Sequence, residues 1–182
     1  MSSSQVSKQR AQGGSGAAPG RLVAVSRMLP LPAAEVFRLL TDARNHARWI
    51  PMTRVEAPPG PPRRGAMVTA VSGPLARRGA PGVVDRMRID RWDPPAEGVP
   101  GVAVFTKLGP LLLGESQIVV EAAGPHRSRA TWSERVRLAG PAPAAALVAP
   151  VLRAMLALAL ARAGREVRAS RRRRPSPTEA PR

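Results

Sequence analysis

Residues 23–42 read VAVSRMLPLPAAEVFRLLTD and carry the most informative pattern of the chain. Its first part, within residues 21–29, is rich in β-branched and apolar residues and predicts a strand. Two prolines end that strand, and the second, Pro32, suits the first turn of a helix. In the segment that follows, Val36 and Leu40 are four residues apart and share one helical face. The stretch therefore predicts a strand, a proline-bounded turn and a short amphipathic helix.

The rest of the chain predicts a second short helix, a series of strands and a final long helix. The second helix is expected over residues 43–49, with Thr41 or Asp42 as its N-cap. Six further strands are predicted, over residues 50–56, 66–71, 83–92, 101–107, 113–122 and 129–138. An apolar repeat of three and four residues predicts a helix over residues 144–168, which Pro150 either begins or kinks. Short turns between strands imply an antiparallel sheet. The predicted fold class is therefore α+β, with a curved sheet of about six to seven strands wrapped on one long C-terminal helix.

The charge of the chain suggests an anionic partner, but its distribution weakens that interpretation. The 182 residues include 29 basic and 12 acidic residues, for a formal net charge of +17. All the basic residues except Lys8 and Lys107 are arginine, which a GC-rich coding bias produces without selection for binding. More than half of the net charge lies in residues 1–21 and 141–182. The sequence therefore disfavours nucleic acid as a partner, and it leaves a peripheral membrane contact through the basic tail open.

The two ends of the chain are predicted to be disordered. Residues 1–20 contain almost no large apolar side chain, and residues 170–182, SRRRRPSPTEAPR, are basic and rich in proline. One domain is therefore expected over residues 21–169. No apolar run typical of a secretory signal follows the first basic residues. Residues 142–163 are long enough to span a bilayer, but Arg153 at their centre disfavours insertion, so a cytoplasmic protein is expected.

The residue types that are missing exclude several kinds of chemistry. Without cysteine there is no disulfide, no thiol nucleophile, no iron–sulfur cluster and no Cys-ligated zinc. The only histidines, His46 and His126, are too few for a His-rich metal site. No phosphate-binding loop, dinucleotide fingerprint or zinc motif occurs. We therefore expect neither a metal nor a cofactor.

Four stretches of the chain resemble the START-like (SRPBCC) superfamily, in its bacterial polyketide cyclase/dehydrase branch. These stretches are VAVSRMLPLPAAEVFRLLTD (23–42), ARNHARWIP (43–51), RIDRWDPP (88–95) and SRATWSERVRL (128–138). The resemblance covers about residues 21–168 and implies the helix-grip fold. It also implies binding of a hydrophobic small molecule, such as a lipid, polyketide or quinone, between the sheet and the C-terminal helix. The chain has no tyrosine, so a cyclase mechanism that relies on a cavity tyrosine is not available to it.

The last predicted strand singles out Glu134 as a candidate proton donor or acceptor. Glu134 alternates onto the same face as Trp132 and Val136. If that face is the concave one, burial in an apolar cavity would raise the pKa of Glu134. The alternatives are that the strand turns Glu134 outward or that Arg88 pairs with it. His46 is a second candidate acid or base, although packing is the favoured interpretation of this histidine.

The other candidate site residues are apolar side chains expected to contact the ligand. Tryptophans can clamp a flat molecule, and methionines form an adaptable lining. The predicted ligand-binding set is Trp49, Met52, Met87, Ile89, Val104, Trp132, Glu134, Leu152, Met155 and Leu156. The leading hypothesis is binding, conversion or transport of a hydrophobic small molecule. The alternatives are a polyketide cyclase/dehydrase-like enzyme that uses Glu134, and a basic protein that contacts nucleic acid or an anionic membrane.

Overall fold

The computed structural model describes residues 20–139 and 145–173, with the backbone alone for residues 145–147. The chain enters through β1 (Leu22–Leu29), α1 (Ala33–Thr41), the single-turn helix η1 (Ala43–Asn45) and α2 (His46–Trp49). The elements that follow are β2 (Thr53–Glu56), β3 (Met67–Ser72), the single turn η2 (Ala76–Arg78), β4 (Val83–Asp93), β5 (Gly101–Pro110), β6 (Leu112–Ala122), β7 (Ser128–Leu138) and α3 (Ala145–Arg173). The order of elements is the one predicted from the sequence.

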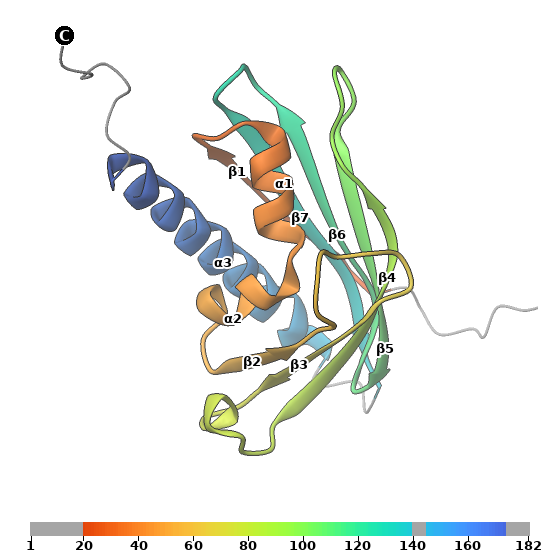
Figure 1. The fold of residues 1–182 in the computed structure, drawn as a ribbon. Coiled ribbons are helices and arrows are strands. Elements are labelled where there is room, and N and C mark those ends of the chain that lie inside the picture. Colours follow the sequence, from red (N-terminus) through yellow and green to blue (C-terminus); the bar gives the residue numbers. More distant parts are fainter. Residues whose placement is uncertain (1–19, 140–144, 174–182) are drawn as a thin grey trace, which may run out of the picture.

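The seven strands form one antiparallel sheet in the order β1-β7-β6-β5-β4-β3-β2. Each strand from β2 to β7 pairs with its neighbour in the chain, whereas β1 closes the far edge by pairing with β7. The sheet curls, and α3 lies across its concave side with α1 and α2 beside it (Figure 1). This arrangement confirms the predicted α+β helix-grip fold.

Local sequence explains how the first helices form. Pro32 stands immediately before α1, where its missing N–H costs no helical hydrogen bond. Phe37 and Leu40, on the apolar face of α1, are completely buried. Asp42, one of the two predicted caps, accepts a hydrogen bond from the Arg44 backbone N–H at 3.1 Å and so begins η1.

The core lies between the concave face of the sheet and the helices. Alternate residues of β7, among them Ala130, Trp132 and Val136, are buried, as the period of two predicts. Leu156 and Leu160 on α3 pack against them with almost no exposed surface. The predicted apolar stripe of α3 is therefore confirmed in the part of the helix that contains Leu156 and Leu160.

The ends of α3 differ from the prediction. The helix begins at Ala145, so Pro150 lies inside it and does not begin it. The helix also continues through Arg173, four residues into the predicted C-terminal tail. Arginine is a good helix former, and its charge is favourable at a helix C-terminus. The rest of that tail and residues 1–19 lie outside the described residues. Within the described ranges, no helix combines the length and the apolar character needed to cross a bilayer.

Candidate functional site

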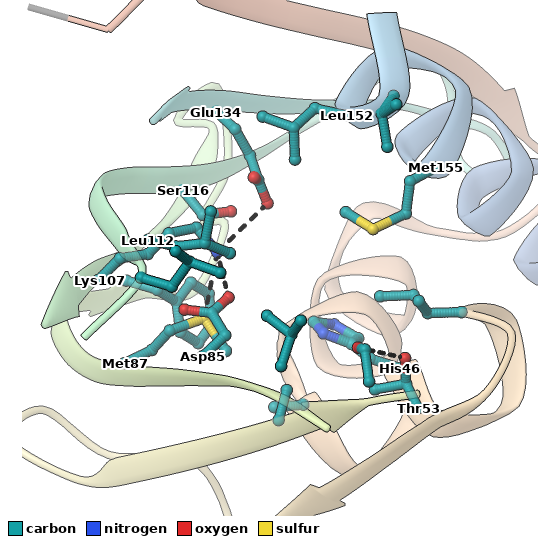
Figure 2. Close-up of a pocket in the computed structure, with 18 of the residues that line it drawn as sticks. His46, Thr53, Asp85, Met87, Lys107, Leu112, Ser116, Glu134, Leu152 and Met155 are labelled. Atoms are coloured by element: carbon teal, nitrogen blue, oxygen red, sulfur yellow. Dashed lines mark hydrogen bonds and ion pairs between the residues drawn. The ribbon is translucent and has the colours of Figure 1, made fainter. Parts of the chain in front are cut away.

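A cavity of about 460 Å³ lies between the sheet and the first half of α3. Strands β2 to β7 form its floor and sides, α2 contributes one wall, and α3 covers it (Figure 2). Most of the lining is apolar, as is typical of sites for small hydrophobic molecules. The apolar lining residues are Ala43, Ile50, Val55, Ala70, Val83, Met87, Phe105, Leu111, Leu112, Trp132, Leu138, Val148, Val151, Leu152 and Met155.

Three charged side chains meet on the sheet side of this cavity, and we call them the charged cluster. Asp85 comes from β4, Lys107 from β5 and Glu134 from β7. The Lys107 ammonium Nζ lies 2.5 Å from Asp85 Oδ2 and 3.8 Å from Glu134 Oε1. Only 4% of the Lys107 side chain, 3% of Glu134 and 15% of Asp85 is exposed. The cluster is therefore an almost completely buried ion network beside an apolar cavity.

Burial disfavours the charged forms of Lys107 and Glu134, whereas the attraction between their opposite charges favours them. Burial lowers the pKa of Lys107, but the neighbouring Glu134 and Asp85 carboxylates outweigh it and hold this pKa above its ordinary value. Burial raises the pKa of Glu134, with a smaller opposing effect from Lys107 and a further upward contribution from Asp85. Lys107 is thus held as an ammonium ion, whereas Glu134 takes up a proton more readily than an ordinary carboxylate.

Two carboxylate oxygens of the cluster have no hydrogen-bond partner among the described residues. They are Glu134 Oε2 and Asp85 Oδ1, both buried. Both residues line the cavity, and Figure 2 shows the Glu134 carboxyl group directed into it. Buried polar atoms in native proteins are almost always paired, so unpaired oxygens in a cavity wall indicate a place for a ligand group or an ordered water.

His46 lies across the cavity from the charged cluster, beside Thr53 (Figure 2). Its Nε2 is 2.7 Å from the carbonyl oxygen of Leu40 and donates to it, which leaves Nδ1 as an acceptor. Burial lowers the pKa of His46 to about 4, so the ring is neutral at physiological pH. The ring also packs on Trp132, with the two ring centres 4.7 Å apart. His46 is therefore a packed residue, as favoured from the sequence, that also forms part of the cavity wall.

Hydrogen bonds fix the orientation of other polar residues in the wall. Trp132 Nε1 donates to Ser116 Oγ at 2.9 Å, and this serine pairs with Glu134 in the register of β6 and β7. Thr53 Oγ1 and Ser72 Oγ are 2.8 Å apart. These bonds hold the walls of the cavity in one arrangement without any ligand.

The structure places five of the ten predicted ligand-binding residues in the cavity wall. They are Met87, Trp132, Glu134, Leu152 and Met155. The alternation of residues along β7 therefore placed Glu134 on the correct face of the sheet, the one toward the cavity. The suggested pairing with Arg88 is wrong, because Arg88 lies on the other face and forms an ion pair with Asp90 at 2.5 Å.

The other five predicted residues lie outside the cavity wall for identifiable reasons. Trp49 packs between α2 and α3, and its Nε1 donates to Glu166 Oε2 at 2.8 Å. Met52 is 53% exposed in the turn before β2. Val104 points to the opposite face of β5 from Phe105 and Lys107.

Ile89 and Leu156 are also outside the cavity wall, although both point toward the interior. Each is almost completely buried within the solid part of the core. Their apolar patterns predicted burial correctly, but periodicity alone does not separate a packed position from a cavity-lining one.

Two members of the charged cluster, Asp85 and Lys107, were not predicted. Lys107 carried a usable signal, because it follows Ala103 and Phe105 at a spacing of two and so shares their buried face. It is also one of only two lysines in a chain dominated by arginine. Asp85 carried a weaker signal, since β4 begins with a less regular alternation and a register shift follows between Asp85 and Met87.

The cavity offers no recognisable metal centre. Within residues 20–139 and 145–173, no group of three or more His, Cys, Asp or Glu side chains could hold a metal ion. The polar end of the cavity combines one ammonium group with two carboxyl groups, which suits proton transfer or hydrogen bonding to an organic molecule.

The chain belongs to the family described as polyketide cyclase/dehydrase and lipid transport, whose model matches residues 21–168. This family has the START-like (SRPBCC) helix-grip fold that the sequence predicted. Its members typically bind hydrophobic ligands, and some are aromatase/cyclases. No curated protein sequence matches the chain.

Solved structures with low sequence identity share the fold. A Thermus thermophilus protein is 17% identical, with a TM-score of 0.62, over 82% of this chain and 99% of that one. The Zhui aromatase/cyclase from Streptomyces is 19% identical, with a TM-score of 0.52, over 82% and 90%. A START superfamily protein from Mycobacterium smegmatis is 13% identical, with a TM-score of 0.54, over 84% and 97%. At these identities the similarity concerns the fold alone.

Proposed function

We propose that this protein binds a hydrophobic small molecule, of the lipid, polyketide or quinone type, in the cavity between the sheet and α3. The observation that carries the proposal is a cavity of about 460 Å³ with a mainly apolar lining and one polar end. That volume lies within the range of small-molecule sites. The ligand would place its apolar body against side chains such as Leu152 and Met155 and its polar group at the charged cluster.

Burial of apolar surface would supply most of the affinity. Each Å² of apolar surface removed from water contributes about 25 cal/mol, before the cost of immobilising the ligand is subtracted. The open side of the cavity supports access, because three lining residues, Val83, Leu111 and Val151, are also exposed on the surface. Val151 is 64% exposed, although its place in the apolar repeat predicted burial. An exposed apolar rim at a cavity suits the entry of an apolar molecule.

The proposal is tested with N-phenylnaphthylamine, an uncharged probe whose fluorescence rises in apolar surroundings. The wild-type protein should bind one probe molecule, and Ala70→Phe should weaken this binding by about tenfold or more because it fills the cavity. Ala24→Phe is the matched control, since it makes the same change in side-chain volume at an exposed position of β1 that does not line the cavity, and it should bind like wild type. Both variants should first be shown to unfold cooperatively. Absence of probe binding to wild type, or equal binding by both variants, would refute the proposal.

A second candidate function is acid–base catalysis on the bound molecule, with Glu134 as the proton donor or acceptor. The observation that favours it is a buried carboxyl group with a raised pKa and an unpartnered oxygen in the cavity. Glu134→Gln should then abolish turnover of a polyketide-type substrate while the probe still binds. Turnover that survives this substitution would remove Glu134 from the mechanism.

A further inference from the structure

The polar atoms left without partners at the charged cluster are all oxygens that accept hydrogen bonds when ionised. They are Asp85 Oδ1 and Glu134 Oε2, and the unprotonated Nδ1 of His46 on the facing wall is a third acceptor. A ligand that enters this part of the cavity therefore meets acceptors on both sides (Figure 2).

Two donors of the same region, the Lys107 ammonium and the Trp132 indole N–H, are already directed at protein atoms. Lys107 Nζ lies 2.5 Å from Asp85 Oδ2 and 3.8 Å from both Met87 Sδ and Glu134 Oε1. The indole N–H of Trp132 is bound to Ser116. Few donors remain for a ligand that could only accept.

The charge of the cavity differs in sign from the charge of the whole chain. Among its lining residues, two carboxyl groups face a single ammonium group, and His46 is neutral. With both carboxyl groups ionised the cavity carries a formal charge of −1, against +17 for the chain. A third carboxylate, brought in by a ligand, would be buried beside these two, and like charges at short range in a buried site are strongly unfavourable.

Resting on the proposed binding function, we infer that the cavity selects ligands whose polar end donates hydrogen bonds and carries no negative charge. Alcohols, phenols and amines share this chemistry, whereas fatty acids and other carboxylates do not, and neither do quinones, whose oxygens only accept; within the proposed function the inference therefore favours the hydroxyl-bearing ligands. The overall positive charge of the chain would suggest the opposite preference. The acceptors of the charged cluster, not the arginines of the surface, are in contact with the bound molecule.

The inference is tested with three competitors that share one alkyl chain, namely decanol, decylamine and decanoate. Each is used at neutral pH to displace N-phenylnaphthylamine from the wild-type protein. Decanol and decylamine should displace the probe, and decanoate should be weaker by about tenfold or more. In the Asp85→Asn/Glu134→Gln double variant Lys107 is the remaining charge, so decanoate should become the strongest competitor.

A matched control separates the cavity from the surface. Asp90→Asn/Glu115→Gln also removes one aspartate and one glutamate charge, but at positions that do not line the cavity. It should leave the order of competitors unchanged. If the probe binds and decanoate displaces it from wild type as well as decanol does, the inference is overturned while the proposed function stands. If the probe does not bind to wild type at all, the proposed function fails and the inference fails with it.

Discussion

The two halves of the interface between the sheet and α3 are built from the same elements but differ in what fills them. In the packed half, Phe37, Leu40, Leu156 and Leu160 fill the space between α1, α3 and the sheet, each at most 1% exposed. In the cavity half, the first turns of α3 stand over the charged cluster with a space of about 460 Å³ between them. The helix α1 packs over β5 to β7 in the first half, whereas in the second half the short η1 and α2 lie beside α3 among the described residues.

This difference separates stability from function within one domain. Close packing in the first half gains dispersion contacts and removes apolar surface from water. The cavity half gives up such contacts and also holds two unpaired carboxylate oxygens. We infer that the packed half stabilises the fold and that the cavity half accommodates the proposed ligand.

The largest effect on stability is expected from Lys107→Met, which leaves Asp85 and Glu134 buried together without a cation. Breaking a buried ion network by removing one partner costs about 3–5 kcal/mol, and urea unfolding at neutral pH measures it. The triple variant Asp85→Asn/Lys107→Met/Glu134→Gln removes all the charges and should recover most of this loss. A loss under about 1 kcal/mol in Lys107→Met would contradict a tightly coupled cluster.

A pair of adjacent substitutions on α3 compares the two halves directly. Leu156→Ala in the packed half should cost about 3 kcal/mol, because it removes a completely buried side chain from a solid core. Met155→Ala in the cavity half should cost about 1 kcal/mol, because this half-buried side chain borders the cavity and has fewer packing partners. Urea unfolding of both variants measures the difference. Equal losses would show that the two halves are packed alike.

A smaller effect is expected from pH, through His46. The pKa of this buried ring is lowered to about 4 in the folded state, while in the unfolded chain it returns to about 6.5. The unfolded state therefore binds the proton first, and stability falls as the pH drops from about 6.5 toward 4. Between pH 7 and pH 5, wild type should lose about 2 kcal/mol more than His46→Gln. If both proteins show the same loss by urea unfolding, His46 does not account for this part of the pH dependence.

The fold was predictable because its signals are local and repeated. The proline-bounded turn before α1, the period of two in β7 and the apolar repeat of α3 each specify one element, and all of them agree with one architecture. Glu134 was found by the same alternation, since a one-residue shift would have moved it to the other face.

The cavity was less predictable because its position depends on which elements cover which part of the sheet. Ile89 and Met87 lie on the same face of β4, yet only Met87 lines the cavity. The pairing of Lys107 with Asp85 joins residues on β4 and β5 across a shifted register, which no pattern within one strand reveals. The arginine-rich composition also drew attention to the surface, whereas the cation that matters for the site is a buried lysine.

The methionine methyl groups can report directly whether a ligand binds between the sheet and α3. Met87 and Met155 line the cavity, whereas Met28, Met52 and Met67 are exposed outside it. In protein labelled with ¹³C at the methionine methyls, titration with N-phenylnaphthylamine should shift the Met87 and Met155 signals through the ring current of the probe and leave the other three in place. Shifts confined to Met28, Met52 or Met67, with Met87 and Met155 unchanged at saturation, would show that the probe binds on the surface and would contradict a ligand site between the sheet and α3.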